Sequence, residues 1–372
     1  MIYLDHAATS PLLDEVREAM EPWFGVPANP SSVHAAGRAA AAAMDRAREE
    51  VALLLGRDPA GIVFVSGATE ANHAAVRGLA ALGVQRFAAS PIEHPSVHAA
   101  LRVAGVAVHA LAVGASGRTA VDLPDDVDGL VLMAVNHETG VRQPIDLAAG
   151  LVRSRGIRLH IDATQALAGG PVVGLDAADT IALSAHKLGG PAGVGALSLR
   201  TGEPFPALFP GAQERGRRAG TANVAGVVGF GAACRIAARE GAARTARWAA
   251  LAEAGHSAVV ALGGRVVGDR AAASPAITTA VFPGPPSPAV RGDLLVQALD
   301  LAGIATSSGA ACASGAIGPS PVLAAMGDPA PEGGLRVSLG PATTAGEIAA
   351  LADALRGILP RIREAARWEA DL

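Results

Sequence analysis

The sequence predicts an α/β fold, with a mostly parallel sheet in a large domain and a smaller α+β domain after it. Short apolar runs alternate with longer amphipathic stretches along much of the chain, as in repeated β-α-β units. In the last third, this alternation gives way to a mixed order of helices and strands. Since half of the 372 residues are hydrophobic, two cores can be filled. We expect a large domain over residues 13–245 and a small one over 1–12 and 246–372.

Each element is expected from its local pattern. Strands are expected at short apolar runs, namely residues 62–65, 86–90, 106–113, 130–135, 159–162, 180–183, 194–199, 277–282 and 335–339. Helices are expected at amphipathic or alanine-rich stretches, namely residues 32–55, 70–82, 95–103, 145–155, 224–240 and 294–302, and at the C-terminus. Because ligands of a parallel sheet bind at the carboxyl ends of its strands, residues that follow these strands are the first candidates for a site.

Composition and charge exclude several classes of protein. The net charge is −4 and no basic run occurs, which argues against a nucleic-acid partner. The first residues do not form a secretion signal, and charge-free stretches are shorter than the roughly 18 apolar residues of a membrane span. Two cysteines cannot form a disulfide framework, and no Cys/His cluster has the spacing of a metal site. We expect a soluble, cytoplasmic protein without a metal and without a membrane.

Lys187 is the only lysine among the 30 basic residues. Elsewhere the chain uses arginine, so the remaining lysine suggests a task that a guanidinium cannot perform. Schiff-base formation is such a task, because it requires a nucleophilic amine. Chance survival on the surface is the alternative. Because Lys187 follows an apolar strand and precedes Gly189 and Gly190, a cofactor-binding role is favoured.

Asp162 ends another apolar strand, three residues before Gln165. A carboxylate at this position is compatible with capping of the following turn or helix. The alternative role is a partner for the pyridinium N–H of pyridoxal phosphate. Taken alone, the residue favours the capping role.

Two further segments are rich in small residues and contain a hydroxyl or thiol group that could take part in a site. Residues 66–70 connect a strand to a helix and predict a phosphate cradle of backbone N–H groups, with the Thr69 hydroxyl beside them. Cys312 lies in a loop of small residues, where an exposed thiol is either reactive or incidental. Cys234 lies in a helical stretch and is interpreted as a small buried hydrophobic residue.

The motifs of the chain follow one another in a specific order. They are residues 3–9, 29–34, 66–72, 93–94, 135–140, 160–165, 184–187, 213–223, 307–312 and 335–338. In this order they resemble the NifS/IscS-type cysteine desulfurases, within the fold-type I (class V aminotransferase-like) pyridoxal-phosphate enzymes. The loop around Cys312 resembles that of the long-loop group of these enzymes.

The resemblance implies a role for each residue around the cofactor ring. Lys187 forms the Schiff base and then moves the Cα proton of the substrate. Asp162 pairs with the pyridinium nitrogen, and Gln165 bonds the phenolic oxygen of the ring. His94 stacks on the ring face and shares in proton transfer.

The resemblance also implies the phosphate and substrate contacts. The phosphate is held by residues from two strand ends and from the second subunit of a homodimer, namely Ala68, Thr69, Ser184, His186 and Thr221. Arg336 clamps the substrate carboxylate, and Asn29 contributes to the substrate site. His137 departs from the family, which usually has asparagine at this position beside the cofactor and the substrate. An imidazole there still donates one hydrogen bond but is bulkier and titrates near neutral pH.

The implied reaction converts L-cysteine to L-alanine and leaves the sulfur as a persulfide on Cys312. The persulfide then passes to an acceptor protein, either a scaffold or a sulfur carrier, as in iron–sulfur cluster assembly. The alternatives are a selenocysteine lyase, another pyridoxal-phosphate lyase or aminotransferase, and a non-catalytic sulfur-carrier scaffold. Cys312 argues against an aminotransferase, and its combination with Lys187 and Asp162 argues against a scaffold.

Overall fold

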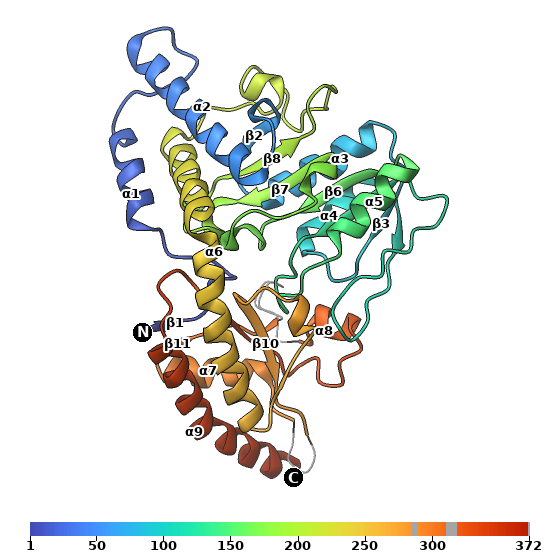
Figure 1. Ribbon diagram of the computed structural model, residues 1–372, viewed down its shortest axis with the longest axis vertical. Coiled ribbons are helices and arrows are strands. Elements are labelled where there is room, and N and C mark those ends of the chain that lie inside the picture. Colours follow the sequence, from blue (N-terminus) through green and yellow to red (C-terminus); the bar gives the residue numbers. More distant parts are fainter. Residues whose placement is uncertain (285–288, 310–317, 371–372) are drawn as a thin grey trace.

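A seven-stranded sheet forms the centre of the larger lobe in the computed structural model (Figure 1). Its order is β2-β8-β7-β6-β5-β3-β4, and β8 runs in the direction opposite to the other six strands. The strands are β2 (Ile62–Val65), β3 (Arg86–Ala89), β4 (Ala107–Ala110), β5 (Gly129–Met133), β6 (Arg158–Asp162), β7 (Thr180–Ser184) and β8 (Gly195–Leu199). The predicted α/β class with a mostly parallel sheet is therefore confirmed.

Helices cover both faces of this sheet. One face carries α1 (Asp14–Met20), α2 (Ala35–Leu55), α5 (Ile145–Arg155) and α6 (Val224–Ala261), and the other carries α3 (Ala68–Ala81) and α4 (Pro95–Ala104). Alternate residues of one strand enter opposite cores: Ile62 packs beneath the first set of helices, whereas Val63 packs beneath α3. The expected strand at 106–113 is shorter, because its partner β3 ends at Ala89.

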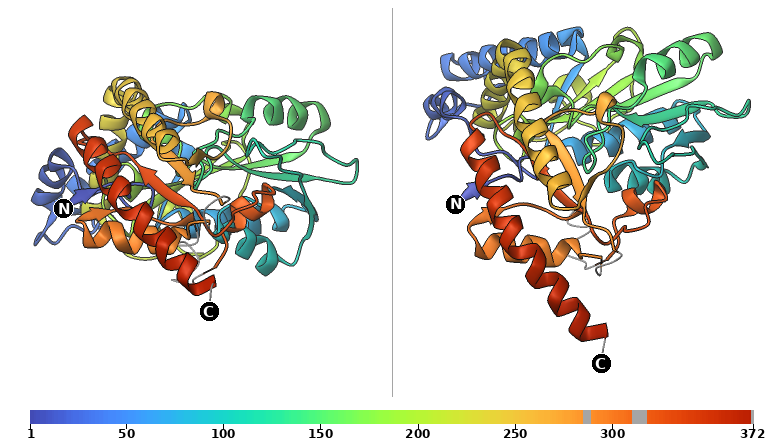
Figure 2. Two further views of the ribbon diagram at one scale, coloured as in Figure 1. Left: turned by 90° about the horizontal axis from the view of Figure 1, so that it is seen from below. Right: turned by 60° about the horizontal axis from the view of Figure 1, so that its bottom comes forward.

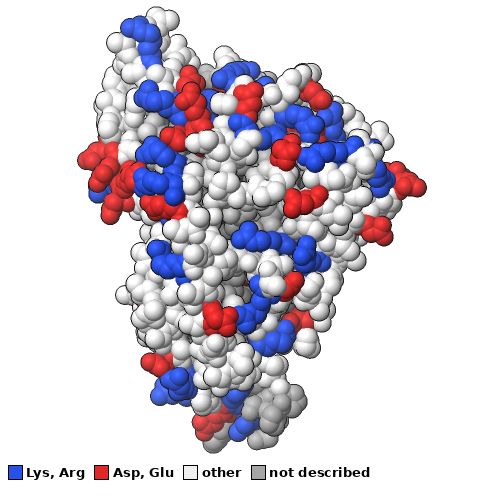
Figure 3. Space-filling model, in the orientation of Figure 1, with Lys and Arg blue, Asp and Glu red and all other residues white. Residues whose placement is uncertain are grey.

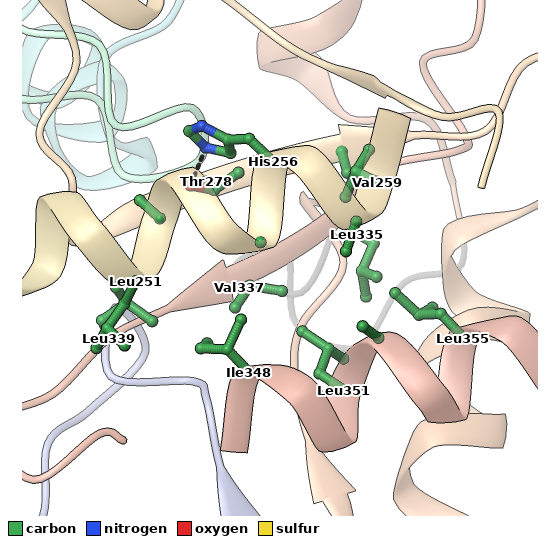
Figure 4. Close-up of a pocket in the computed structure, with 15 residues that line it drawn as sticks. Leu251, His256, Val259, Thr278, Leu335, Val337, Leu339, Ile348, Leu351 and Leu355 are labelled. Carbon is green, nitrogen blue, oxygen red and sulfur yellow. Dashed lines mark hydrogen bonds between the residues drawn. The ribbon is translucent and has the colours of Figure 1, made fainter. Parts of the chain in front are cut away.

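The smaller lobe has its own sheet and its own core. Its elements are β1 (Ile2–Tyr3), β9 (Arg265–Val266), β10 (Ile277–Val281), α7 (Gly292–Leu301), β11 (Ile304–Ala305), α8 (Pro321–Ala325), β12 (Leu335–Ser338) and α9 (Ala345–Ala370). Strands β12, β10 and β9 form an antiparallel sheet, and β1 pairs with β11. Figure 4 shows Leu251, Val337, Ile348 and Leu351 directed toward one another between α6, β12 and α9.

Helix α6 connects the two lobes and corrects one expectation. The helix expected at 224–240 continues without a break to Ala261. Gly241, which follows the expected end, does not terminate it. A Cβ added to Gly241 would lie 2.4 Å from the backbone nitrogen of Gly170, so this glycine allows a close approach of two backbones. The expected boundary between the domains, at residue 245, lies inside this helix. The domain limits of 13–245 and of 1–12 with 246–372 stay a prediction.

The structure describes residues 1–284, 289–309 and 318–370. Within these ranges, none of the helices combines the length and the apolar character needed to cross a bilayer. Helix α9 runs along the outside of the small lobe, and its C-terminal end projects from it (Figure 2). On the face shown in Figure 3, basic and acidic side chains are interspersed.

Candidate active site

The carboxyl ends of the parallel strands surround a cavity of about 460 Å³, which we call the sheet-edge cavity. It is lined by residues that follow β2, β5, β6 and β7 and by the N-terminal segment, namely Ala7, Ala8, Ser66, Gly67, Ala68, Thr69, His94, Met133, Val135, His137, Asp162, Thr164, Gln165, Ser184, His186, Lys187, Ala192 and Gly193. This volume is in the usual range of small-molecule sites. Nine of the predicted site residues therefore meet in one place, namely Ala68, Thr69, His94, His137, Asp162, Gln165, Ser184, His186 and Lys187.

Lys187 ends the short 3₁₀ turn that follows β7. Its Nζ donates hydrogen bonds to the carbonyl oxygens of Ala7 and Ala8, at 2.5 and 2.6 Å. The side chain is partly buried and lies in the wall of the sheet-edge cavity. The amine is thus held at the strand edge where a ligand of the sheet would bind.

Asp162, the last residue of β6, is 6% exposed. Its Oδ1 accepts the backbone N–H of Thr164 at 3.0 Å, so turn capping is one of its roles. Its Oδ2 accepts a hydrogen bond from Asn72 Nδ2 at 2.8 Å. Because Asp162 also lines the cavity, the two interpretations of this residue are compatible.

Helix α3 begins at the cavity, and no side chain of its N-cap residue bonds its first N–H groups. Its N-cap, Gly67, has no side chain to bond them, and Ala68 and Thr69 line the cavity. Such an end attracts anions through its unpaired N–H groups and the helix dipole. Ser184 and His186 lie in the same wall, and burial, followed by the neighbouring Lys187, lowers the pKa of His186 to about 4.

His94 and His137 form a pair on the wall of the cavity. Their rings meet edge to face, with centroids 5.4 Å apart and planes at 71°. Burial lowers the pKa of His94 and lowers that of His137 further, with His94 itself adding to the effect on His137. His137 Nδ1 is buried without a hydrogen-bond partner within the described residues. A buried, unpaired nitrogen beside a cavity is a position where a bound ligand can supply the missing bond.

Three predicted site residues lie outside the cavity wall, and a fourth is not described by the structure. Asn29 and Thr221 are exposed and do not line the cavity. Arg336 is 1% exposed and lies behind His137, whose carbonyl it bonds at 3.1 Å, while its other nitrogen pairs with Asp5 at 2.9 Å. Cys312 lies outside the described residues.

The comparison with protein families covers most of the chain. The model of the family described as "Aminotransferase class-V" matches residues 2–351. The chain belongs to the aminotransferase class-V family. The predicted membership is thereby confirmed.

Among curated relatives of this class-V aminotransferase protein, a cysteine desulfurase of Cereibacter sphaeroides is 40% identical over 97% of this chain and 96% of its own length. A solved structure of a NifS-like protein has a TM-score of 0.88 and 29% identity, covering 96% of this chain and 99% of the other. A structure of SspA in complex with cysteine has a TM-score of 0.78 and 28% identity, covering 92% and 100% of the two chains.

Several residues near the cavity of this class-V family member were not identified from the sequence. Ala7 and Ala8 bond the lysine through their carbonyl groups, which no side-chain pattern reveals. Thr164 lines the cavity two residues after Asp162. Asn72 and His160 are fully buried behind it. Asn72 could have been identified as a polar residue on the buried face of a predicted helix.

Glu138 connects the His137 wall to both ends of the segment that contains Cys312. Its Oε2 accepts a hydrogen bond from Ser320 Oγ at 2.5 Å, and a Cβ added to Gly309 would lie 2.1 Å from the same oxygen. Burial raises the pKa of Glu138 to about 7, although Ser320 and Arg336 oppose the shift. The carboxyl group is therefore protonated in the folded protein at pH values where it is ionised in the unfolded chain.

We expect replacement of Glu138 by glutamine to flatten the pH dependence of stability. With the pKa raised from 4.5 to about 7, its stabilising effect is complete below pH 4.5 and is lost as the pH rises through 7. The loss amounts to about 3 kcal/mol at most. Urea unfolding at pH 5 and pH 8 would measure it, with Glu18→Gln as the exposed control. An identical pH dependence in the wild type and Glu138→Gln would contradict this assignment.

Proposed function

We propose that this protein is a pyridoxal-phosphate-dependent cysteine desulfurase. The observation that carries the proposal is the convergence of Lys187, Asp162 and the N-terminus of α3 on one cavity. The amine, the carboxylate and the anion-binding helix end match the aldehyde, the ring nitrogen and the phosphate of this cofactor. Curated relatives over nearly the full length bear the name cysteine desulfurase, and SspA has been solved with cysteine.

The cavity also supports the cofactor on physical grounds. At about 460 Å³ it has room for a small aromatic phosphate and an amino acid together. The N–H groups after Gly67 have no side-chain cap and can bind an anion. The buried Nδ1 of His137 and the buried Oγ1 of Thr164 are unpaired within the described residues. These unmet donors and acceptors surround the place where the ring and the phosphate would bind.

When bound, pyridoxal phosphate supplies an electron sink for the bond at the substrate Cα. Lys187 would hold the cofactor and carry the Cα proton at its Nζ. Asp162 would keep the ring nitrogen protonated, since both of its oxygens are already fixed in place. Gln165 would bond the phenolic oxygen, and its Nε2 at present donates to Ala7.

The phosphate and carboxylate of the ligands would be bound at opposite sides of the site. Ala68, Thr69, Ser184 and His186 would hold the phosphate. Asn29 belongs to the proposed substrate contacts together with His137. Arg336 would bind the substrate carboxylate, which requires it to exchange its partner Asp5 for the new anion.

The sulfur would leave through Cys312. Its thiolate attacks the substrate sulfur, so that an S–S bond forms and the Cβ–S bond breaks. The electron pair of the broken bond stays with the carbon fragment, which takes up a proton and is released as alanine. The resulting persulfide is then available to an acceptor protein, a scaffold or a sulfur carrier, for uses such as iron–sulfur cluster assembly.

The assembly and the location of the protein are further parts of the proposal. We place Thr221 at the phosphate of a second subunit, because it is exposed and does not reach the cavity of its own chain. A homodimer would then have two complete sites. A cytoplasmic location agrees with a free cysteine at the reacting position.

The test is L-cysteine-dependent formation of alanine and sulfide by the purified protein with pyridoxal phosphate and a reductant. We expect the two products in equal amounts. Cys312→Ala is expected to keep the visible absorption of the cofactor but to lose persulfide formation and sulfide release. Unchanged sulfide release by Cys312→Ala would refute the role of the thiol, and a coloured wild-type protein that forms neither product would refute the desulfurase.

A further inference from the structure

Asn72 is the centre of a hydrogen-bond network behind the sheet-edge cavity. The residue lies on α3 and is fully buried. Its Nδ2 is 2.8 Å from Asp162 Oδ2 and 2.9 Å from Ser96 Oγ. Its Oδ1 is 2.9 Å from His160 Nε2. Both ends of the amide are therefore engaged, and one end contacts the proposed partner of the cofactor ring.

The direction of these bonds follows from Asp162. A carboxylate only accepts, so the amide atom that faces it is the nitrogen and the atom that faces His160 is the oxygen. His160 Nε2 must then carry a proton. Burial lowers the pKa of His160 to about 4, so the ring is neutral near pH 7 and its Nδ1 accepts from the Thr180 hydroxyl at 2.8 Å. The orientation of Asn72 is thus fixed from both sides.

The hydrogen-bond network continues from Asn72 through Ser96 to His94. Ser96 Oγ accepts one amide hydrogen of Asn72 and lies 2.8 Å from His94 Nδ1. The backbone N–H of Ser96 donates to the same ring nitrogen at 3.1 Å. A ring nitrogen that accepts a backbone N–H carries no proton, so the Ser96 hydroxyl donates its hydrogen to Nδ1 as well. In the neutral ring of His94 the proton is therefore on Nε2.

We propose that Asn72 is a positioning residue that fixes His94 as its Nε2–H tautomer and orients Asp162 with the same amide group. His94 then acts on its ligand as a neutral donor, because its one basic nitrogen faces Ser96. Lys187 alone then transfers the Cα proton, without His94. The catalytic consequence rests on the proposed function, whereas the tautomer of His94 does not.

The surroundings of His94 favour the neutral ring as well. Burial is the largest influence and lowers its pKa, Lys187 and His98 lower it further, and Asp162 raises it. A proton added at Nδ1 would also break both hydrogen bonds from Ser96.

The test is ¹⁵N NMR of histidine-labelled holoenzyme, with the His94 signal identified by its loss in His94→Gln. The nitrogen shifts distinguish the two neutral tautomers and the imidazolium. We expect the Nε2–H form of His94 in the wild type from pH 6.5 to 8.5. In Asn72→Leu we expect the ratio of the Nε2–H form to the Nδ1–H form to fall by about tenfold, which is the effect of losing one hydrogen bond. An Nδ1–H or charged ring in the wild type, or an unchanged ratio in Asn72→Leu, would overturn the proposal.

A second pair of variants guards against misfolding of Asn72→Leu, which leaves the partners of the amide unsatisfied. Ser96→Ala removes the link between Asn72 and His94, whereas Ser96→Thr preserves the hydroxyl. We expect Ser96→Ala to lower the tautomer ratio and kcat by about tenfold with little change in KM, and Ser96→Thr to restore both. Equal behaviour of the two variants would argue against the network. A holoenzyme with the expected tautomer that does not consume cysteine would refute only the desulfurase.

Discussion

Replacement of Lys187 by arginine is expected to abolish turnover and the visible absorption of the bound cofactor together. The change preserves the positive charge but removes the only amine side chain of the protein. Under the proposed function it also removes the attachment of the cofactor and a positioned base, and the loss of such a base alone costs roughly 10²–10⁴-fold in rate. Absorption spectra of the purified variant and an alanine assay with L-cysteine would measure both effects.

The matched control adds an amine instead of removing one. Arg118 is exposed, so Arg118→Lys places a second lysine on the surface without touching the cavity. We expect this variant to keep the wild-type spectrum and the wild-type rate. Circular dichroism would verify that Lys187→Arg is folded. A folded Lys187→Arg that still forms alanine from cysteine at the wild-type rate would show that this amine has no part in the chemistry.

The residues at strand ends could be predicted because the rule that locates them is local. An apolar run, the polar residue after it and the common edge of a parallel sheet are sufficient to bring Lys187 and Asp162 together. The small residues before Thr69 likewise predict the anion-binding N-terminus of α3. These features require no knowledge of which distant segment packs against which.

Features that depend on distant contacts were beyond the sequence. The length of α6 is one, because Gly241 acts through its contact with Gly170 and not as a helix end. The pairing of Arg336 with Asp5 joins residues at opposite ends of the chain. The role expected for Cys312 rests on the sequence alone, since this residue lies outside the described residues.

The buried network shows why the chemistry of His94 could not be inferred from its type alone. Histidine can donate or accept at either nitrogen, and the choice depends on the partners of each. Here the choice passes from Asp162 through Asn72 and Ser96. The resemblance to a family implies a role for His94 in proton transfer, whereas the hydrogen bonds of this chain favour a fixed donor.

Replacement of Asp162 by asparagine is expected to lower kcat by roughly three orders of magnitude while the protein remains folded. A negative charge about 4 Å from a positive ring nitrogen contributes on the order of 4 kcal/mol near a protein surface, which corresponds to about a thousandfold in rate. The geometry adds to this loss. Both Asn72 Nδ2 and the backbone N–H of Thr164 donate to residue 162, so an amide nitrogen there must face one of two donors. Steady-state kinetics with L-cysteine would measure kcat.

Asp179→Asn separates this effect from the general cost of altering a buried carboxylate. Asp179 is 7% exposed and accepts hydrogen bonds from Arg158 and from the backbone N–H of Leu159, but it does not line the cavity. We expect Asp179→Asn to lower the unfolding temperature and to leave kcat within about twofold, since its ion pair acts on stability and not on the ring. If both variants lost activity equally, the carboxylate of Asp162 would be important for folding rather than for the cofactor. If only Asp162→Asn lost it, the charge at the end of β6 would be the one that the reaction requires.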